Sequence, residues 1–125
     1  MLSQAQLWAH KAQGKYRHGC VVLDKRGAII SYGYNREKTH PKQAYYSSRV
    51  GQPHRIRLHA EIDALIRCRE EPHTLLVVRI GKNGEYRYSR PCEVCQLAIV
   101  ASGLEYVLYT GRNGELVEQT AGSFS

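Results

Sequence analysis

The sequence lacks any long apolar stretch. No uninterrupted run approaches the roughly 20 residues that a membrane-spanning helix needs, so we expect no membrane insertion. The first six residues also lack the charged-then-apolar order of a secretory signal peptide, and we therefore expect a cytoplasmic protein. Apolar residues still make up 42% of the 125 residues, which is too many for a disordered segment. We expect one domain over residues 1–125 with a hydrophobic core of its own.

Acidic residues and cysteines are both scarce. Eleven acidic residues face 18 lysines and arginines, which gives a formal net charge of +7. An excess of this size favours an anionic partner, either a nucleotide phosphate or a nucleic-acid backbone. The four cysteines do not indicate a disulfide framework, because a reducing compartment and the Cys92-x-x-Cys95 spacing favour metal binding instead.

Two short motifs carry the chemistry of the chain. They are His59-Ala60-Glu61 and Pro91-Cys92-Glu93-Val94-Cys95. An imidazole and two thiolates are three zinc ligands, and three ligands leave the fourth tetrahedral position open to water, as in catalytic zinc sites. Glu61 is placed to move protons rather than to bind the metal. Together the motifs match H-x-E…P-C-x-x-C, the signature of zinc-dependent base deaminases.

With these motifs, and with Gly33-Tyr34-Asn35 upstream, the chain resembles the cytidine and deoxycytidylate deaminase superfamily from about Gly19 to Thr110. The resemblance implies an α/β fold with three α/β/α layers around a mixed sheet of about five strands. It also implies a Zn²⁺ cofactor and a homo-oligomer. The implied reaction is hydrolytic deamination of a cytosine ring, in which Glu61 carries a proton from water to the ring nitrogen and then to the departing amino group.

The expected substrate contacts are less specific than the metal ligands. The resemblance places Asn35 at the substrate sugar, and we expect further contacts from Arg36, Ala60 and Ser89. His18 and Cys20 are weaker candidates near the start of the first strand. Residues 36–57 form a basic segment with interleaved aromatic residues, which either clamps a phosphate or stacks a base, or is an ordinary solvated loop. A second metal site at His40 and His54, as in some deoxycytidylate deaminases, is a further alternative.

Periodicity and turn residues predict the order of the secondary structure. The predicted elements are helices over residues 3–13, 58–69 and 91–102, a short helix within 43–50, and strands over 19–24, 28–34, 74–80, 105–110 and 115–119. The last strand should run antiparallel to its neighbour, because a parallel return needs a long crossover and few residues follow Thr110. An antiparallel end resembles the free-cytidine and toxin-type branches of the superfamily. Gly33-Tyr34-Asn35 and His59 resemble the deoxycytidylate and transfer-RNA adenosine branches instead, so the sequence leaves the substrate open.

Three functions are compatible with the sequence. The first is deamination of a cytosine nucleoside or nucleotide by a cytoplasmic enzyme. The second is deamination of cytosine or adenine in single-stranded DNA or RNA, which the positive charge and the nine tyrosines favour, since such grooves stack bases and attract the backbone. The third is a non-catalytic zinc scaffold, although a structural zinc site needs a fourth ligand and has no use for Glu61.

Overall fold

The structure is a computed structural model that describes residues 1–125. Its helices match the predicted positions to within a few residues. The elements in chain order are α1 (Leu2–Lys11), β1 (Arg17–Leu23), β2 (Ile29–Tyr34), α2 (Pro41–Arg49), α3 (Ala60–Arg67), β3 (Thr74–Ile80), β4 (Tyr86–Arg87), α4 (Glu93–Ser102), β5 (Tyr106–Thr110), β6 (Leu116–Thr120) and the short 3₁₀ helix η1 (Ala121–Phe124).

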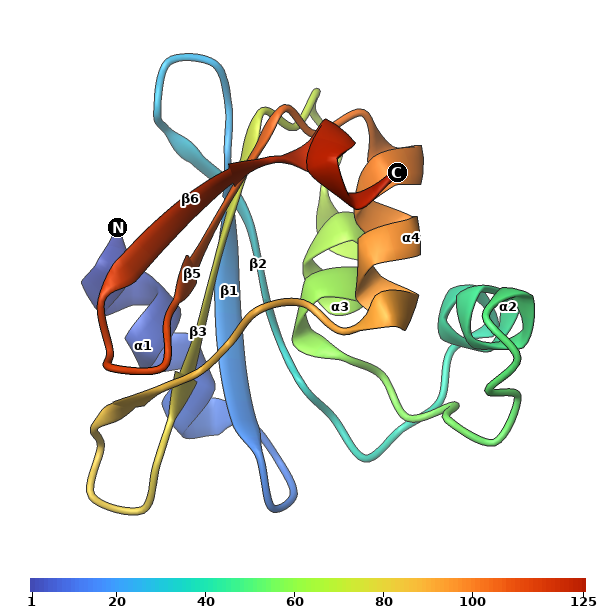
Figure 1. The fold of residues 1–125 in the computed structure, drawn as a ribbon, viewed down its shortest axis with the longest axis horizontal. Helices are drawn as coiled ribbons and strands as arrows, with labels where there is room; N and C mark the ends of the chain where they lie inside the picture. The colour runs from blue at the N-terminus through green and yellow to red at the C-terminus, as the bar shows by residue number, and fades with distance from the viewer.

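The strands form one mixed sheet in the order β2-β1-β3-β5-β6. β1 runs antiparallel to β2 and β3, while β3 and β5 are parallel. The α1 helix covers one face of this sheet, and α3 and α4 cover the other (Figure 1). These layers confirm the predicted three-layer α/β/α fold. The antiparallel pairing of β5 with β6 likewise confirms the predicted C-terminal hairpin.

A sixth strand, β4, was not predicted. It pairs with the end of β3, where Arg79 lies opposite Arg87 and Ile80 opposite Tyr86. The turn at residues 81–84 therefore closes a hairpin between β3 and the second motif. With only two residues, β4 is too short to show the alternating pattern from which strands are recognised.

The central strand β3 supplies both halves of the core. Leu75, Leu76, Val77 and Val78 are fully buried, as the nearly continuous apolar run predicts. Because successive side chains of a strand point to opposite faces, Leu75 and Val77 pack in the core beneath α3 and α4, while Leu76 and Val78 pack beneath α1. The two helical layers are thus anchored on the same strand.

Two glycines let the helices approach the sheet closely. A Cβ on Gly33 of β2 would lie 2.4 Å from the carbonyl oxygen of Ala60 in α3, and one on Gly19 of β1 would lie 2.1 Å from the backbone nitrogen of Ala9 in α1. Neither contact is possible for a side-chain carbon, so any other residue would displace a helix. Gly33 therefore fixes the position of the helix that begins beside His59.

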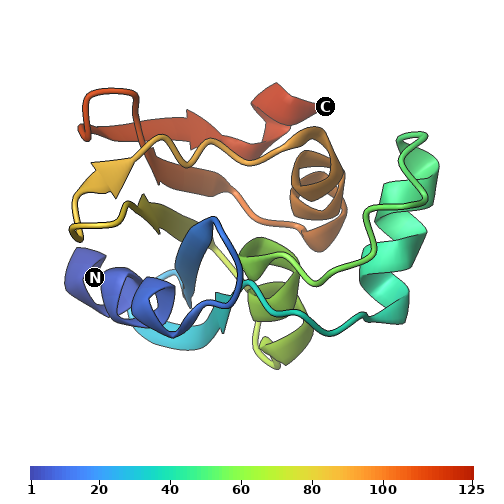
Figure 2. The same cartoon turned by 90° about the horizontal axis from the view of Figure 1, so that it is seen from below.

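The connection between β2 and α3 contains the predicted short helix. α2 begins at Pro41, earlier than predicted, because the Nδ1 atom of His40 accepts a hydrogen bond from the Lys42 backbone and so caps the helix. It lies outside α3 and α4, away from the sheet (Figure 2). None of the helices in the structure combines the length and the apolar character needed to cross a bilayer.

Candidate active site

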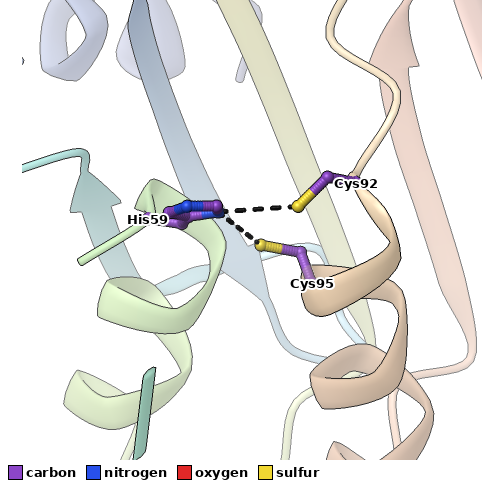
Figure 3. Close-up of side chains that lie close together, drawn as sticks. All are labelled: His59, Cys92 and Cys95. Carbon is purple, nitrogen blue, oxygen red and sulfur yellow. Dashed lines mark hydrogen bonds between the residues drawn. The ribbon is translucent and has the colours of Figure 1, made fainter. Parts of the chain in front are cut away.

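The two motifs meet because α3 and α4 begin next to each other. His59 is the residue before α3 and Cys92 the residue before α4, and both have extended backbone conformations. The α4 helix thus begins after Cys92, and Pro91, predicted in its first turn, precedes the cap. Neither of these two side chains forms a capping hydrogen bond at the start of its helix. Both side chains are free to point into the space between the helices, where Cys95 joins them from the first turn of α4 (Figure 3).

The three predicted ligands have the spacing of a tetrahedral metal site. The Nδ1 atom of His59 lies 3.6 Å from the Sγ atom of Cys92 and 3.4 Å from that of Cys95. At ordinary zinc–nitrogen and zinc–sulfur bond lengths, two tetrahedral ligands are about 3.6 Å apart. These are also the only three His, Cys or acidic residues whose ligand atoms cluster this closely. The residues therefore fit a zinc ion without rearrangement.

The two thiols are prepared for a metal by their contact with each other. The hydrogen bond from Cys95 lowers the pKa of Cys92 to about 3, and His59 acts in the same direction against the effect of burial. The same contact, together with burial, raises the pKa of Cys95. The pair thus holds one thiolate and one proton, and a divalent cation would displace that proton on binding.

Glu61 lies next to this centre and is almost completely buried, with 4% of its surface exposed. Burial, reinforced by the charge of Cys92, raises the pKa of Glu61 to about 7. A carboxyl group that gains and loses a proton near neutral pH is suited to general acid–base catalysis. Its position in the first turn of α3 keeps it near the metal ligands without adding it to their cluster.

These residues open onto a cleft of about 670 Å³, a size typical of small-molecule sites. Its lining is rich in cationic side chains, and the one acid apart from Glu61 is Glu37, which pairs with Arg57 at 2.9 Å. The lining residues are Gln13, Gly14, Lys15, Tyr16, His18, Asn35, Arg36, Glu37, Arg55, Arg57, Leu58, His59, Ala60, Glu61, Arg79, Arg90 and Cys92. The predicted excess of positive charge is therefore concentrated at the site.

Of the four predicted substrate contacts, the structure brings Asn35, Arg36 and Ala60 to the cleft but not Ser89. The Oδ1 atom of Asn35 accepts a hydrogen bond from the His18 backbone at 2.7 Å, so this side chain also holds β1 against the end of β2. Arg36 is partly neutralised, because its Nε atom lies 3.2 Å from the buried carboxylate of Asp63.

Ser89 is buried away from the cleft. Its hydroxyl donates to the Val77 carbonyl at 2.9 Å and accepts from the Thr110 backbone at 2.7 Å. It therefore ties the segment before Pro91 to β3 and β5. Its side chain has a structural position. Ser89 was a candidate because it falls just before the second motif, where the resemblance implies substrate contacts.

Sequence reasoning missed several residues of the cleft. Lys15, Tyr16 and Arg79 line it but belong to no motif. The signal for Arg79 was present, because it is the one charged residue in the otherwise apolar strand 74–80. His18, a weaker candidate, also lines the cleft. Burial, and then the charges of Arg79 and His59, lower its pKa to about 4, so it is a neutral imidazole at pH 7.

The other weak candidates lie elsewhere. Cys20 is fully buried beneath α3, where its thiol donates to the Ala60 carbonyl at 2.9 Å. His40 caps α2, and neither it nor His54 belongs to a cluster of three or more metal-binding groups. All four cysteines are free of disulfide bonds.

Residues 1–111 match the family model of the cytidine and deoxycytidylate deaminase zinc-binding region. The chain belongs to this family. It is accordingly a zinc-dependent deaminase, a hydrolase acting on carbon–nitrogen bonds, and its cofactor is zinc. The scaffold hypothesis is therefore set aside, and Glu61 has the neighbours that an enzyme of this family requires.

Solved structures share the fold at low sequence identity. The dCMP deaminase of the cyanophage S-TIM5 in its apo form has a TM-score of 0.60 and 20% identity, over 89% of this chain and 79% of that one. The same enzyme in complex with dCMP and dUMP has a TM-score of 0.60 and 21% identity, over 89% and 78%.

A second deaminase-like fold comes from RibD of Acinetobacter baumannii. Its form 2 has a TM-score of 0.51 and 21% identity, over 88% of this chain but only 27% of the longer RibD chain. Among curated proteins, no sequence gives a significant match. At these identities the likeness shows the fold, and the substrate has to be argued from the cleft itself.

Proposed function

We propose that the protein deaminates a cytosine nucleoside or nucleotide to the corresponding uracil compound, with release of ammonia. The observation that carries this proposal is the group formed by His59, Cys92 and Cys95 with Glu61 buried beside it, at the inner end of a cleft of nucleotide size. The phage dCMP deaminase that shares the fold was solved with dCMP and dUMP, which supports a nucleotide of this class.

The proposed reaction uses the residues as follows. His59, Cys92 and Cys95 would hold the zinc ion, which lowers the pKa of a coordinated water toward about 7 and so makes a nucleophile available at neutral pH. Glu61 takes the proton from the attacking water and delivers it to N3 of the ring. It then takes the remaining proton from the hydroxyl group added at C4 and passes it to the amino group, which leaves as ammonia while the water oxygen remains on C4 as the uracil carbonyl.

The rest of the cleft has the groups to orient a substrate. Asn35 and the start of α3 at Ala60 border the space next to Glu61, where we place the sugar and the ring. Because Glu61 lines the cleft and is only 4% exposed, its carboxyl group is largely shielded from bulk water. Shielding of this kind strengthens the interactions between the protein and the developing charges on the ring.

A substrate panel tests the proposal. Ammonia release by the zinc-loaded protein would be measured with cytidine, deoxycytidine, their mono- and triphosphates, and a cytosine-containing single strand, with Glu61→Gln as the blank. Turnover of a free nucleoside or nucleotide supports the proposal. Turnover of the strand alone, with a steep loss of activity as salt is added, would contradict it and indicate a polynucleotide deaminase.

A further inference from the structure

Arg79 is a half-buried arginine whose guanidinium group has no hydrogen-bond or ion-pair partner in the chain. It follows four fully buried residues of β3 and shares a strand face with Val77 and Leu75, since alternate residues point the same way. That face is covered by α3 and α4 and carries the cleft. In the sheet, Arg79 lies directly opposite His18 of β1.

No hydrogen bond or ion pair satisfies the Arg79 guanidinium, and its Nε atom is completely buried without a partner. The guanidinium lies over the ring of Tyr16, whose centre is 4.7 Å from Cζ. Buried or half-buried cations are normally paired with a carboxylate or another anion. The guanidinium group of Arg79, which lies over Tyr16 and lines the cleft, is therefore suited to bind an anion that the chain itself does not supply.

Lys15 shares this arrangement. Its Nζ atom lies 5.6 Å from the centre of the same Tyr16 ring, and it too lines the cleft without an ion pair. The cleft has four other cations. Arg36 contacts Asp63 at 3.2 Å and Arg57 contacts Glu37 at 2.9 Å, while Arg55 donates a hydrogen bond to Gln52 and Arg90 lies over the ring of Phe124. Lys15 and Arg79 are thus an uncompensated pair of positive charges around one aromatic ring.

The chemistry of this pair favours a phosphate monoester. A phosphate monoester carries a charge of about −1.5 to −2 at pH 7 and presents three acceptor oxygens, which matches two cations. A phosphodiester within a strand carries a single charge and would leave one cation unmatched. Guanidinium groups also bind phosphate through two parallel hydrogen bonds. The pair lies on the same cleft as Glu61 and His59, so one ligand can reach both ends.

We infer that Arg79 and Lys15 bind the terminal 5′-phosphate of a cytosine nucleotide, so that the substrate is a nucleoside monophosphate rather than a free nucleoside or a strand. This inference rests on the proposed deamination for the identity of the base, but the phosphate site is a property of Arg79, Lys15 and Tyr16 alone. The segment 36–57, which the sequence offered as an alternative phosphate clamp, also contributes Arg36, Arg55 and Arg57 to the lining of the cleft.

Direct binding tests the inference without turnover. Calorimetry with the zinc-loaded protein would compare the product nucleotides UMP and dUMP with uridine, deoxyuridine and the 5′-methyl phosphodiester of UMP. We expect a monophosphate to bind at least about tenfold more tightly than its nucleoside or the diester, as charge-assisted hydrogen bonds predict. Equal affinities, or tighter binding of the diester or of a short oligonucleotide, would overturn the inference.

Variants assign the effect to the residues. Arg79→Met should remove the advantage of the monophosphate, and Lys15→Met should reduce it by about threefold, as expected for an exposed cation. The matched control is Arg112→Met, because Arg112 also lies over a tyrosine ring, that of Tyr88 at 4.4 Å, but outside the cleft. Circular dichroism would check that each variant is folded.

The outcomes separate the two proposals. If Arg79→Met and Lys15→Met both bind the monophosphate as tightly as the wild type, the phosphate site is wrong, whatever the enzyme deaminates. If the phosphate effect is found but no compound of the panel releases ammonia, the proposed deamination fails and the phosphate site stands. With both correct, Arg79→Met raises KM for the nucleotide by a larger factor than KM for the nucleoside.

Discussion

At the inner end of the cleft, the metal ligands and Glu61 come from two short segments that each begin a helix. At the outer end, Lys15 and Tyr16 come from the loop before β1, and Arg79 comes from β3, far away in the sequence. The inner end is specified by local spacing, so it can be read as a motif. The outer end exists only because β1 and β3 pair antiparallel. The metal ligands are therefore specified locally, whereas the phosphate site that we propose depends on the fold.

The largest effect should follow from removing a ligand at the inner end. In Cys95→Ser, the hydroxyl replaces a fully buried thiol and is a poor zinc ligand, so we expect zinc content near zero and no measurable deamination. Elemental analysis of the purified protein checks this. Cys68→Ser, at the far end of α3, is the control and should keep its zinc. Wild-type zinc content in Cys95→Ser would contradict the ligand assignment.

Removing the proton carrier should abolish the chemistry while sparing the metal. Glu61→Gln keeps the shape of the side chain but cannot exchange a proton, and we expect kcat to fall by about 100- to 10,000-fold at unchanged zinc content. Glu93→Gln, an exposed acid in the first turn of α4, should change kcat by no more than about twofold. Steady-state kinetics on zinc-loaded samples measures kcat for both variants. Equal losses of kcat in the two variants would contradict the role of Glu61.

A third change should displace the start of α3, next to His59, without replacing a metal ligand. In Gly33→Ala, the added Cβ meets the backbone of Ala60 and Ala64, and we expect a loss of about 3 kcal/mol in the free energy of unfolding. Chemical denaturation of the metal-free protein measures this. Gly122→Ala, whose Cβ meets nothing within 4 Å, should be close to neutral. Similar free energies of unfolding for the two variants would mean that α3 does not pack against Gly33 as the structure shows.

The last effect concerns His18, a cleft residue close to both Arg79 and His59. Its pKa falls from 6.5 to about 4 on folding, so between these values the unfolded chain binds a proton that the folded chain does not. Stability should therefore decrease as the pH drops from 6.5 to 4, by at most about 3 kcal/mol from this residue. The positive charge of a bound metal ion would also lower the pKa of His18.

The matched variants for His18 isolate this contribution. His18→Gln should flatten the dependence of unfolding free energy on pH across that interval, relative to the wild type. His10→Gln, on the exposed side of α1, should leave the wild-type curve in place. If both variants follow the wild-type curve, His18 is not held neutral by its surroundings.

The same contrast explains how much the sequence could predict. The strands with clear apolar runs, the helix stripes and the Asn-Gly turn before β6 led to the correct fold, since these signals are local. The ligands and Glu61 could be assigned because their spacing within each helix start is part of the chemistry. The hairpin with β4 and the position of Ser89 could not, because short pairings and buried hydroxyl contacts leave no periodic pattern.

Arg79 marks the limit of that approach. A charged residue in a buried strand could have suggested a function for Arg79. Its neighbours Tyr16 and His18, however, are known only once β1 and β3 are paired. For Asn35 the opposite holds, because the motif suggested a substrate contact and the structure shows in addition that its side chain binds the His18 and Gln13 backbones. A residue near the site can therefore have a structural role as well.

The most direct test of the account is the fate of the water oxygen. Zinc-loaded protein would be incubated with CMP and dCMP in water enriched in heavy oxygen, and the product analysed by mass spectrometry with ammonia measured in parallel. The account predicts a uracil nucleotide carrying one labelled oxygen, formed in equal amount to the ammonia and absent with Glu61→Gln. Product without the label, or no product from either nucleotide, would contradict it.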